Sequence, residues 1–361
     1  MKPHSSLTKG LKVGLLAILC AGAAQAEAIK PKDVDPALAE LGKRLFYDAR
    51  LSGDTSLACA SCHQPDKAFT DGLALSEAYS GVSHFRNTPT LANVGKRAAW
   101  NHDGRLGTNL NDVTREMITE TYLMNMDMRL MQERLKQDPV YVEMFRAAGL
   151  GEPSNGGARK AIAAFQDTIV SRNAPIDTGD LTAAALRGQA LFNGKAGCVS
   201  CHSGDRYTDD KVHNTGVQDN PEIWADPERH IAFVTYAKFM GVENYMNLRQ
   251  DLGAFVRDHS YTSRRTFLTP SLRELTHTAP YMHNGTLATL EEVVDFYNAG
   301  GGADTLKDQR IRPLDLNDSE KSDLVEFLKS LSGDSFDTDA YVWRKDDYDY
   351  TLIENWRETA N

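Results

Sequence analysis

The sequence predicts an all-α protein built from two tandem domains that arose by internal duplication of one unit. Apolar residues recur at helical spacing, and no convincing run alternates between apolar and polar residues. Several segments of the first half return in the same order in the second half. The chain has 361 residues, of which 41% are hydrophobic and 25% charged, which fits two soluble globular domains of ordinary size.

The first 26 residues predict a secretory signal peptide. An apolar run at 13–21 leads to the small-residue cleavage site Ala24-Gln25-Ala26, and it is too short to span a bilayer as a mature helix. Three lysines make the start of the chain positive, namely Lys2, Lys9 and Lys12. We therefore expect export to the periplasm. Cys20 leaves a lipid anchor open as the lesser alternative.

The mature chain is strongly acidic. Removal of residues 1–26 deletes three lysines and no acid, so the formal net charge moves from −10 to −13. Such a protein repels nucleic acid and suits a basic partner or none. We therefore expect no nucleic-acid partner.

Three helices are predicted from caps and apolar stripes. The first begins at Asp35 and Pro36, which supply a cap and a first-turn proline. Its stripe is Leu38, Leu41 and Leu45. Similar stripes run over 162–169 and 324–331, and the last stops at Gly333. The segment 171–179, with its proline and glycine, is the predicted linker.

The duplication carries one insertion. Thr88–Leu91 matches Thr269–Leu272, and Trp100–Leu106 matches Tyr281–Leu287, both at an offset of 181 residues (269 − 88 and 281 − 100). The Cys-x-x-Cys-His motifs are offset by only 139 (202 − 63), which leaves 181 − 139 = 42 extra residues in the second half. The predicted domains are residues 27–172 and 180–334, followed by an acidic, aromatic extension over 335–361.

All four cysteines of the mature chain belong to two haem-attachment motifs. These motifs are Cys59-Ala60-Ser61-Cys62-His63 and Cys198-Val199-Ser200-Cys201-His202. The two thiols add across the vinyl groups of a haem, and the following histidine ligates its iron. A zinc site is the alternative, but zinc does not explain a histidine after both pairs. We predict two covalently bound haem c groups, with His63 and His202 as proximal ligands, and no disulfide.

Two other patterns have a structural and a functional interpretation. His102 and His283 occupy the same place in the two repeats, which favours a turn residue bonded to backbone or to a haem propionate. Five methionines fall within fifteen residues, namely Met117, Met124, Met126, Met128 and Met131. Methionine usually fills core gaps. The alternative is a thioether placed over the first haem.

These motifs resemble the bacterial di-haem cytochrome c peroxidase family, which includes the MauG-type enzymes. Besides the two haem motifs, the resemblance covers Phe69–Gly72, Arg86–Leu91, Asp103–Arg105, Pro270–Arg273 and Thr278–Gly285. It implies two cytochrome c-like helical domains with a calcium ion between them, and Asn87 matches the family's asparagine at that ion. It also implies hydrogen peroxide as the substrate of the first haem. The second haem would accept electrons from a small periplasmic cytochrome c or cupredoxin.

The sequence departs from the family around the first haem. His102 stands where the family has a tryptophan, and the family's pocket glutamate falls at Tyr122 or Leu123. The distal glutamine likewise maps to Asp112 or Val113. Glu120 is the best substitute acid, because helical spacing places it near the face of Leu123, and Glu116 is next. The candidate catalytic residues are therefore Glu120, Glu116 and His102.

The sixth ligand of the second haem varies within the family and falls in the stretch that precedes Thr278–Tyr281. His277 has the only strong iron-binding atom there, so we predict it as the distal ligand, with Met282 and then Tyr281 as alternatives. A methionine would raise the reduction potential relative to histidine.

Three functions fit these residues. The leading hypothesis is a periplasmic, cytochrome-c peroxidase-like oxidoreductase that reduces hydrogen peroxide with electrons from a small periplasmic carrier. The second is a MauG-like enzyme that oxidises a protein or organic substrate through high-valent haem. The third is a non-catalytic di-haem electron carrier with both irons six-coordinate. A homodimer is left open.

Overall fold

The computed structural model describes residues 28–79 and 83–344. The predicted signal peptide and the end of the predicted C-terminal extension lie outside these residues. The helices of the first half are α1 (Pro36–Phe46), α2 (Cys59–Cys62), α3 (Leu110–Thr119), α4 (Met128–Lys136), α5 (Pro139–Ala147) and α6 (Asn155–Asp167). Those that follow are α7 (Pro175–Thr178), α8 (Ala183–Asn193), α9 (Glu222–Ala225), α10 (Pro227–Phe239), α11 (Phe255–Asp258), α12 (Leu290–Asn298) and α13 (Asp318–Lys329).

Helices dominate the described residues, as the sequence predicts. The sheet is a single antiparallel pair, β1 (Val212–His213) and β2 (Phe267–Leu268), with Val212 opposite Leu268. Short 3₁₀ turns connect the helices; η5 (Cys198–Ser200) and η8 (Leu275–His277) are the two that bear on the site. No helix within 28–79 and 83–344 is long and apolar enough to cross a membrane.

The predicted helices form where local signals are strong. The Asp35 carboxylate accepts hydrogen bonds from the backbone amides of Ala37 and Leu38 at 2.9 and 3.2 Å and so caps α1. A reciprocal capping box between Asn317 and Glu320 starts α13. The predicted linker is partly helical, since it contains α7. Ile176 of α7 packs into the core of the second half.

Each half is built on one closely packed helix pair, α1 with α6 and α8 with α13. A glycine permits each crossing. A Cβ atom added to Gly42 would lie 1.9 Å from the carbonyl oxygen of Ala161, and one added to Gly188 would lie 1.9 Å from that of Asp323. Both halves thus use the same close approach at a glycine, and the duplication stays a prediction from the sequence.

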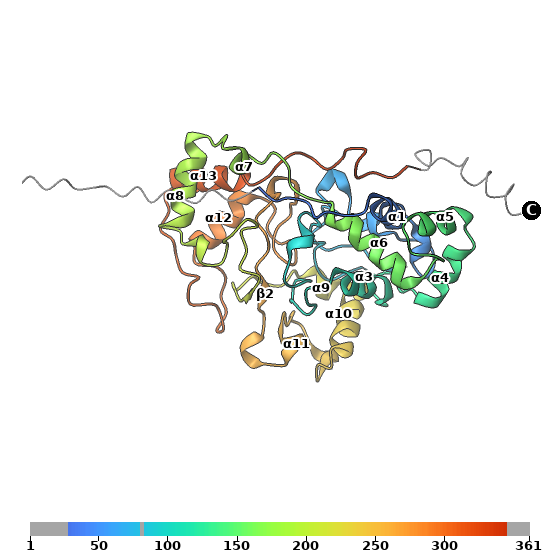
Figure 1. The fold of residues 1–361 in the computed structure, drawn as a ribbon. Helices are drawn as coiled ribbons and strands as arrows, with labels where there is room; N and C mark the ends of the chain where they lie inside the picture. Colours follow the sequence, from blue (N-terminus) through green and yellow to red (C-terminus); the bar gives the residue numbers. More distant parts are fainter. Residues whose placement is uncertain (1–27, 80–82, 345–361) are drawn as a thin grey trace, which may run out of the picture.

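Residues 214–265, which lie between β1 and β2, contain the extra length of the second half, and we call them the inserted segment. Its helices α9–α11 lie beside the first half in Figure 1. Phe233 and Tyr236 of α10 pack against Phe85 and Tyr122 in a shared apolar cluster. The predicted boundary at residue 180 assigns this segment to the second domain, yet much of its buried surface faces the first.

The chain also returns to the first half after α13. Residues 335–344, which we call the strap, run from the end of the second half back toward α1 (Figure 1). Phe336 and Tyr341 are 2% and 3% exposed and belong to the hydrophobic core of the first half. The described part of the predicted extension is therefore a packed element.

Candidate haem sites and catalytic pocket

The first haem motif is held in a geometry that suits iron binding. Cys59 and Cys62 lie in α2, and His63 follows at its end. Nδ1 of His63 is 2.8 Å from the carbonyl oxygen of Phe69, so Nδ1 carries the proton and Nε2 is free to ligate a metal. Burial lowers the pKa of His63, which keeps the imidazole neutral, as a ligand must be.

The second motif repeats this arrangement. Nδ1 of His202 is 2.8 Å from the carbonyl oxygen of Tyr207, and burial lowers the pKa of this imidazole too. Cys198 and Cys201 are free thiols, as are Cys59 and Cys62, so all four are available for thioether bonds. The residues present therefore fit two covalently attached haems.

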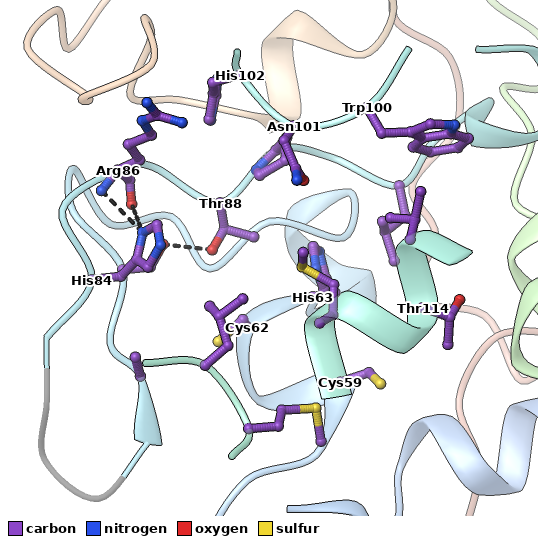
Figure 2. A pocket seen from close by; sticks show the side chains of 18 of the residues that line it. Cys59, Cys62, His63, His84, Arg86, Thr88, Trp100, Asn101, His102 and Thr114 are labelled. Carbon is purple, nitrogen blue, oxygen red and sulfur yellow. Dashed lines mark hydrogen bonds between the residues drawn. The ribbon is translucent and has the colours of Figure 1, made fainter. Parts of the chain in front are cut away.

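A cavity of about 1300 Å³, including its open mouth, lies beside the first motif. Its lining includes Cys59, Cys62 and His63, and Figure 2 shows these side chains facing the same space as Asn101 and Trp100. Arg97 also lines it; the guanidinium donates to the Thr90 carbonyl at 2.8 Å, and burial lowers the pKa of Arg97 to about 10. A partly buried cation at an apolar cavity suits a haem carboxylate.

The polar wall of the cavity is one ion network. Arg105 donates to Asp103 at 2.8 Å and to Glu116 at 2.6 Å. Arg86 lies 2.6 Å from the same Asp103 carboxylate, and the hydroxyl of Tyr236 donates to it at 2.5 Å. Arg86, Arg105 and Tyr236 all line the cavity. The inserted segment thus contributes a phenol to the pocket of the first half.

Neither predicted catalytic glutamate is among the residues that line this cavity. Glu116 acts on it indirectly, through its ion pair with Arg105. Glu120 lies just beyond the end of α3, where its backbone is extended (φ −63°, ψ 130°). Helical spacing from Glu120 to Leu123 therefore does not apply. Burial, and then the charge of Glu116, raise the pKa of Glu120.

His102, the third catalytic candidate, does line the cavity. Its Nε2 is 2.8 Å from the carbonyl oxygen of Asn87, and burial lowers the pKa of His102 to about 4. The ring of His283 lies edge-on to it, at 6.5 Å between centroids. His102 is neutral and bonded to backbone, which matches its interpretation as a turn residue.

Sequence reasoning missed one histidine of this cavity, His84. Its ring stacks on Phe85 with centroids 4.6 Å apart, and its Nδ1 accepts a hydrogen bond from the Arg86 amide at 3.0 Å. Burial lowers the pKa of His84 to about 3. The sequence did contain a signal. His84 stands just before Arg86–Leu91, and the second half has no histidine at the matching position.

Asn87 joins the two halves through its backbone. Its amide donates to the His283 carbonyl at 2.9 Å, while its side-chain nitrogen donates to the Leu73 carbonyl at 2.6 Å. That pairing directs the side-chain donor toward Leu73 and leaves the amide oxygen as the group that could bind a hard cation.

The three candidate distal ligands of the second haem are placed differently. Nε2 of His277 lies 3.1 Å from the Gly333 carbonyl oxygen, and its side chain is 31% exposed. Tyr281 packs against the same core cluster as Cys198, and its hydroxyl donates to the Leu275 carbonyl at 2.7 Å. Met282 adopts a left-handed backbone conformation (φ 74°). His277 and Tyr281 are each bonded to a backbone carbonyl, so His277 stays the predicted distal ligand, with Met282 and Tyr281 as alternatives.

The methionine run is mostly core, in line with its structural interpretation. Met126 and Met131 are 3% and 0% exposed. Met117 and Met124 also border the cavity, so a thioether does lie near the first haem site.

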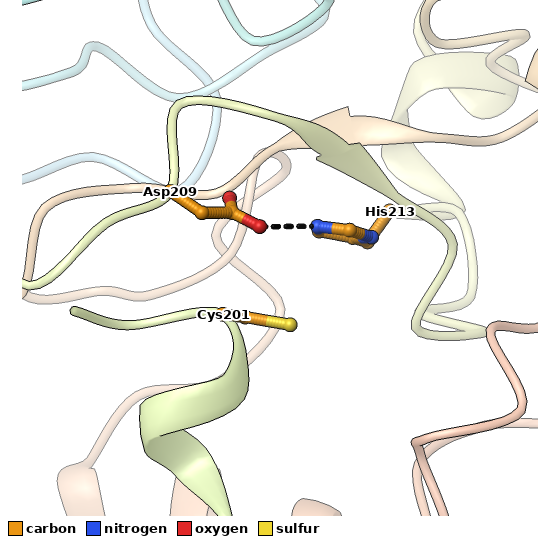
Figure 3. Close-up of side chains that lie close together, drawn as sticks. All are labelled: Cys201, Asp209 and His213. Carbon is orange, nitrogen blue, oxygen red and sulfur yellow. Dashed lines mark hydrogen bonds and ion pairs between the residues drawn. The ribbon is translucent and has the colours of Figure 1, made fainter.

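A second group of potential ligands surrounds Cys201. Figure 3 shows Asp209 and His213 beside this cysteine, and the His213 ring is 2.9 Å from the Asp209 carboxylate. Because Cys201 belongs to a haem motif, its sulfur is committed to a thioether bond. These residues therefore lie beside the second haem site and are not a separate metal centre.

Known proteins are similar to this chain in both sequence and fold. Residues 36–182 match the family model described as di-haem cytochrome c peroxidase. Cytochrome-c peroxidase IdrP2 of Denitromonas iodatirespirans is 47% identical over 304 residues, covering 82% of each chain. MauG of Methylorubrum extorquens is 37% identical over 315 residues, covering 84% of this chain and 81% of its own.

Solved structures agree with these relatives. The crystal structure of a MauG-like protein associated with microbial copper homeostasis matches with a TM-score of 0.75 and 29% identity, over 92% of this chain and all (100%) of its own. The di-haem peroxidase BthA of Burkholderia thailandensis has the same fold, with a TM-score of 0.64 and 23% identity, over 84% of this chain and 88% of its own. With two haem motifs, free proximal nitrogens and these relatives, the chain belongs to the di-haem cytochrome c peroxidase family, a family of oxidoreductases that includes MauG.

Proposed function

We propose that this chain is a periplasmic di-haem enzyme that reduces hydrogen peroxide in the cavity beside His63. Electrons would come from a small periplasmic carrier, a c-type cytochrome or a cupredoxin, by way of the second haem. The observation that carries the proposal is the cavity itself, because its walls combine a metal-ligating histidine with a buried, fixed guanidinium. An acidic mature chain suits a carrier with a basic contact face.

The haem, when bound, would supply the iron that binds peroxide and the electrons that reduce it. The protein's part is mainly electrostatic. Arg105 is held by Asp103 and Glu116, so its positive charge is fixed in the cavity wall before any substrate enters. A preorganised charge of this kind stabilises negative charge that develops on a reacting oxygen. Glu116 would orient Arg105, and Glu120, which does not line the cavity, would act on the reaction only indirectly.

The same proposal includes one calcium ion between the two halves, at Asn87. The backbone of Asn87 already bridges the halves, and an amide oxygen is a ligand that calcium accepts. Chelation of the purified holoprotein should then lower its thermal midpoint, and added calcium should restore it. A midpoint indifferent to both treatments would remove calcium from the proposal.

A direct test mixes the holoprotein with hydrogen peroxide and a reduced carrier. We expect carrier oxidation that depends on peroxide and on both haems. The unreacted protein should also show one high-spin haem. Two low-spin haems and no peroxide consumption would instead identify an electron carrier.

A MauG-like activity on a larger substrate is the second candidate. Two observations favour it: the 37% identity to a MauG protein, and a cavity lined by no glutamate other than Glu77. In that case peroxide would still be consumed, but oxidation of a protein or organic substrate would replace oxidation of the carrier. Product analysis with and without a carrier separates the two activities.

A further inference from the structure

The carbonyl group that fixes His63 belongs to a backbone conformation that needs support. Ala68 and Phe69 both have positive φ angles, 48° and 61°. This left-handed region is unfavourable for residues that carry a Cβ atom, and it persists where surrounding packing holds it. The hydrogen bond to His63 therefore depends on what packs against Phe69.

The strap supplies much of that packing. The Phe69 ring is 0% exposed, and the rings of Phe336 and Tyr341 lie 5.7 and 5.8 Å from it, at 72° and 86°. These are the edge-to-face contacts that aromatic rings prefer. Phe46 of α1 adds another ring at 6.1 Å, and it also contacts His63 at 6.5 Å.

The strap is attached to the first half by its backbone. The hydroxyl of Tyr47 donates to the Tyr341 carbonyl at 3.1 Å, and the Lys43 ammonium group donates to the Asp339 carbonyl at 3.0 Å. The Arg172 guanidinium lies 5.7 Å from the centroid of the Tyr341 ring. The two strap rings are thus held against Phe69.

The second half provides an internal comparison. Tyr207, whose carbonyl accepts from His202, also has a positive φ of 54°. Its ring packs against Phe192 of α8 and Phe327 of α13, at 5.9 and 6.1 Å, both from its own half. The second proximal site is therefore supported within its own half, whereas the first takes two rings from the distant end of the chain.

We propose that the strap positions the proximal ligand of the first haem. Phe336 and Tyr341 hold Phe69 so that its carbonyl keeps the hydrogen bond to Nδ1 of His63. A hydrogen bond at this nitrogen makes a ligating imidazole more basic, which stabilises oxidised iron and lowers the reduction potential. The inference rests on the proposed function only in taking the first haem as the reactive one, and it does not depend on peroxide chemistry.

The test compares the reduction potentials of both haems in the holoprotein and its variants. In Phe336→Leu/Tyr341→Leu we expect an upward shift of the first-haem potential, a changed iron–histidine stretching band, and no shift of the second potential. Tyr341→Phe keeps the ring and should retain the wild-type potential. Tyr207→Leu should shift the second potential alone, which also assigns the two titration steps.

Asp339→Ala is the matched control within the strap, because the Asp339 side chain is 86% exposed and pairs with Arg344 of the strap itself, while Lys43 bonds to the Asp339 backbone. An unchanged first-haem potential in the folded double variant would overturn the proposal, as would equal shifts of both haems. If the double variant does not retain haem, the two single leucine variants decide by the same criteria. If the variants show these shifts but the wild-type protein does not turn over peroxide, the proposed function is refuted and this inference stands.

Discussion

The ion pair between Arg86 and Asp251 offers a quantitative test of how the inserted segment is attached. Two hydrogen bonds of 2.7 and 2.8 Å join the guanidinium to the carboxylate, and the side chains are 3% and 1% exposed. Arg86 outweighs the opposing effect of burial and lowers the pKa of Asp251, so the carboxylate is charged at neutral pH. Asp251→Asn would leave Arg86 sharing Asp103 with Arg105.

Removing one partner of a buried pair costs about 3–5 kcal/mol, because the other charge stays buried. With an unfolding entropy of about 2 cal/mol/K per residue, that corresponds in a chain of this size to a fall of roughly 4–7 °C in the apparent unfolding midpoint. Thermal melts of the holoprotein, followed by far-ultraviolet circular dichroism, measure the shift. Limited proteolysis within residues 214–265 should accelerate in the same variant, since the inserted segment loses its buried attachment.

The control is a pair with the same geometry and a different environment. Arg187 and Asp323 are joined by hydrogen bonds of 2.7 and 2.6 Å, but the Arg187 side chain is 61% exposed. Exposed ion pairs are screened by solvent and contribute little, so Asp323→Asn should lower the midpoint only slightly. Equal midpoints for Asp251→Asn and Asp323→Asn would refute the argument that burial sets the cost.

Three further predictions concern the pocket, the second haem and pH. Glu116→Gln should cut the peroxide rate by about 10–100-fold, because Arg105 loses its orienting partner. Glu120→Gln should cut this rate less. Stopped-flow measurements of peroxide decay, on variants that keep both haems attached, check both expectations. If His277 is the distal ligand, His277→Ala should convert one low-spin haem to high spin while Tyr281→Phe leaves the visible spectrum unchanged, and the opposite result would identify Tyr281. Burial raises the pKa of Asp219 from 3.8 to about 6, so its stabilising contribution is complete below pH 4 and is lost as pH rises through 6. The free energy of unfolding should then fall by up to about 3 kcal/mol over that range, and Asp219→Asn should flatten this dependence in melts recorded from pH 4 to 7.

The parts of this molecule that sequence predicts well are those fixed by near neighbours. The cap at Asp35 and the stripe that follows it lie within one helix, so α1 begins where the pattern says it does. The haem motifs are equally local. The placement of Glu120 was harder, because α3 ends at Thr119 and the helical phase that would align Glu120 with Leu123 is lost. The long-range partners of Arg86 and Phe69 have no signal in a single sequence.

The inserted segment illustrates why its docking could not be predicted. On α10 the buried residues include Phe233 and Tyr236, yet Ile231 and Phe239 are 63% and 60% exposed, so apolar residues occur on both faces. A helix of this kind has no single apolar stripe that announces its buried side. Its orientation is decided by contacts such as the Tyr236 hydroxyl on Asp103, more than 130 residues away in the chain.

The two halves share the same local chemistry at their haem motifs, and two of the differences between them come from segments outside the matched motifs. Both proximal histidines donate to a carbonyl at 2.8 Å, and both helix pairs cross at a glycine. Only the first half has a cavity wall completed by Tyr236 of the inserted segment and a proximal carbonyl caged by the strap. Both additions are encoded after the second haem motif, yet both act on the first haem site. The division of labour that we propose, with peroxide at one haem and electron entry at the other, therefore rests on segments that follow the second haem motif. An isolated first half would lack both the phenol of its pocket and the support of its proximal ligand.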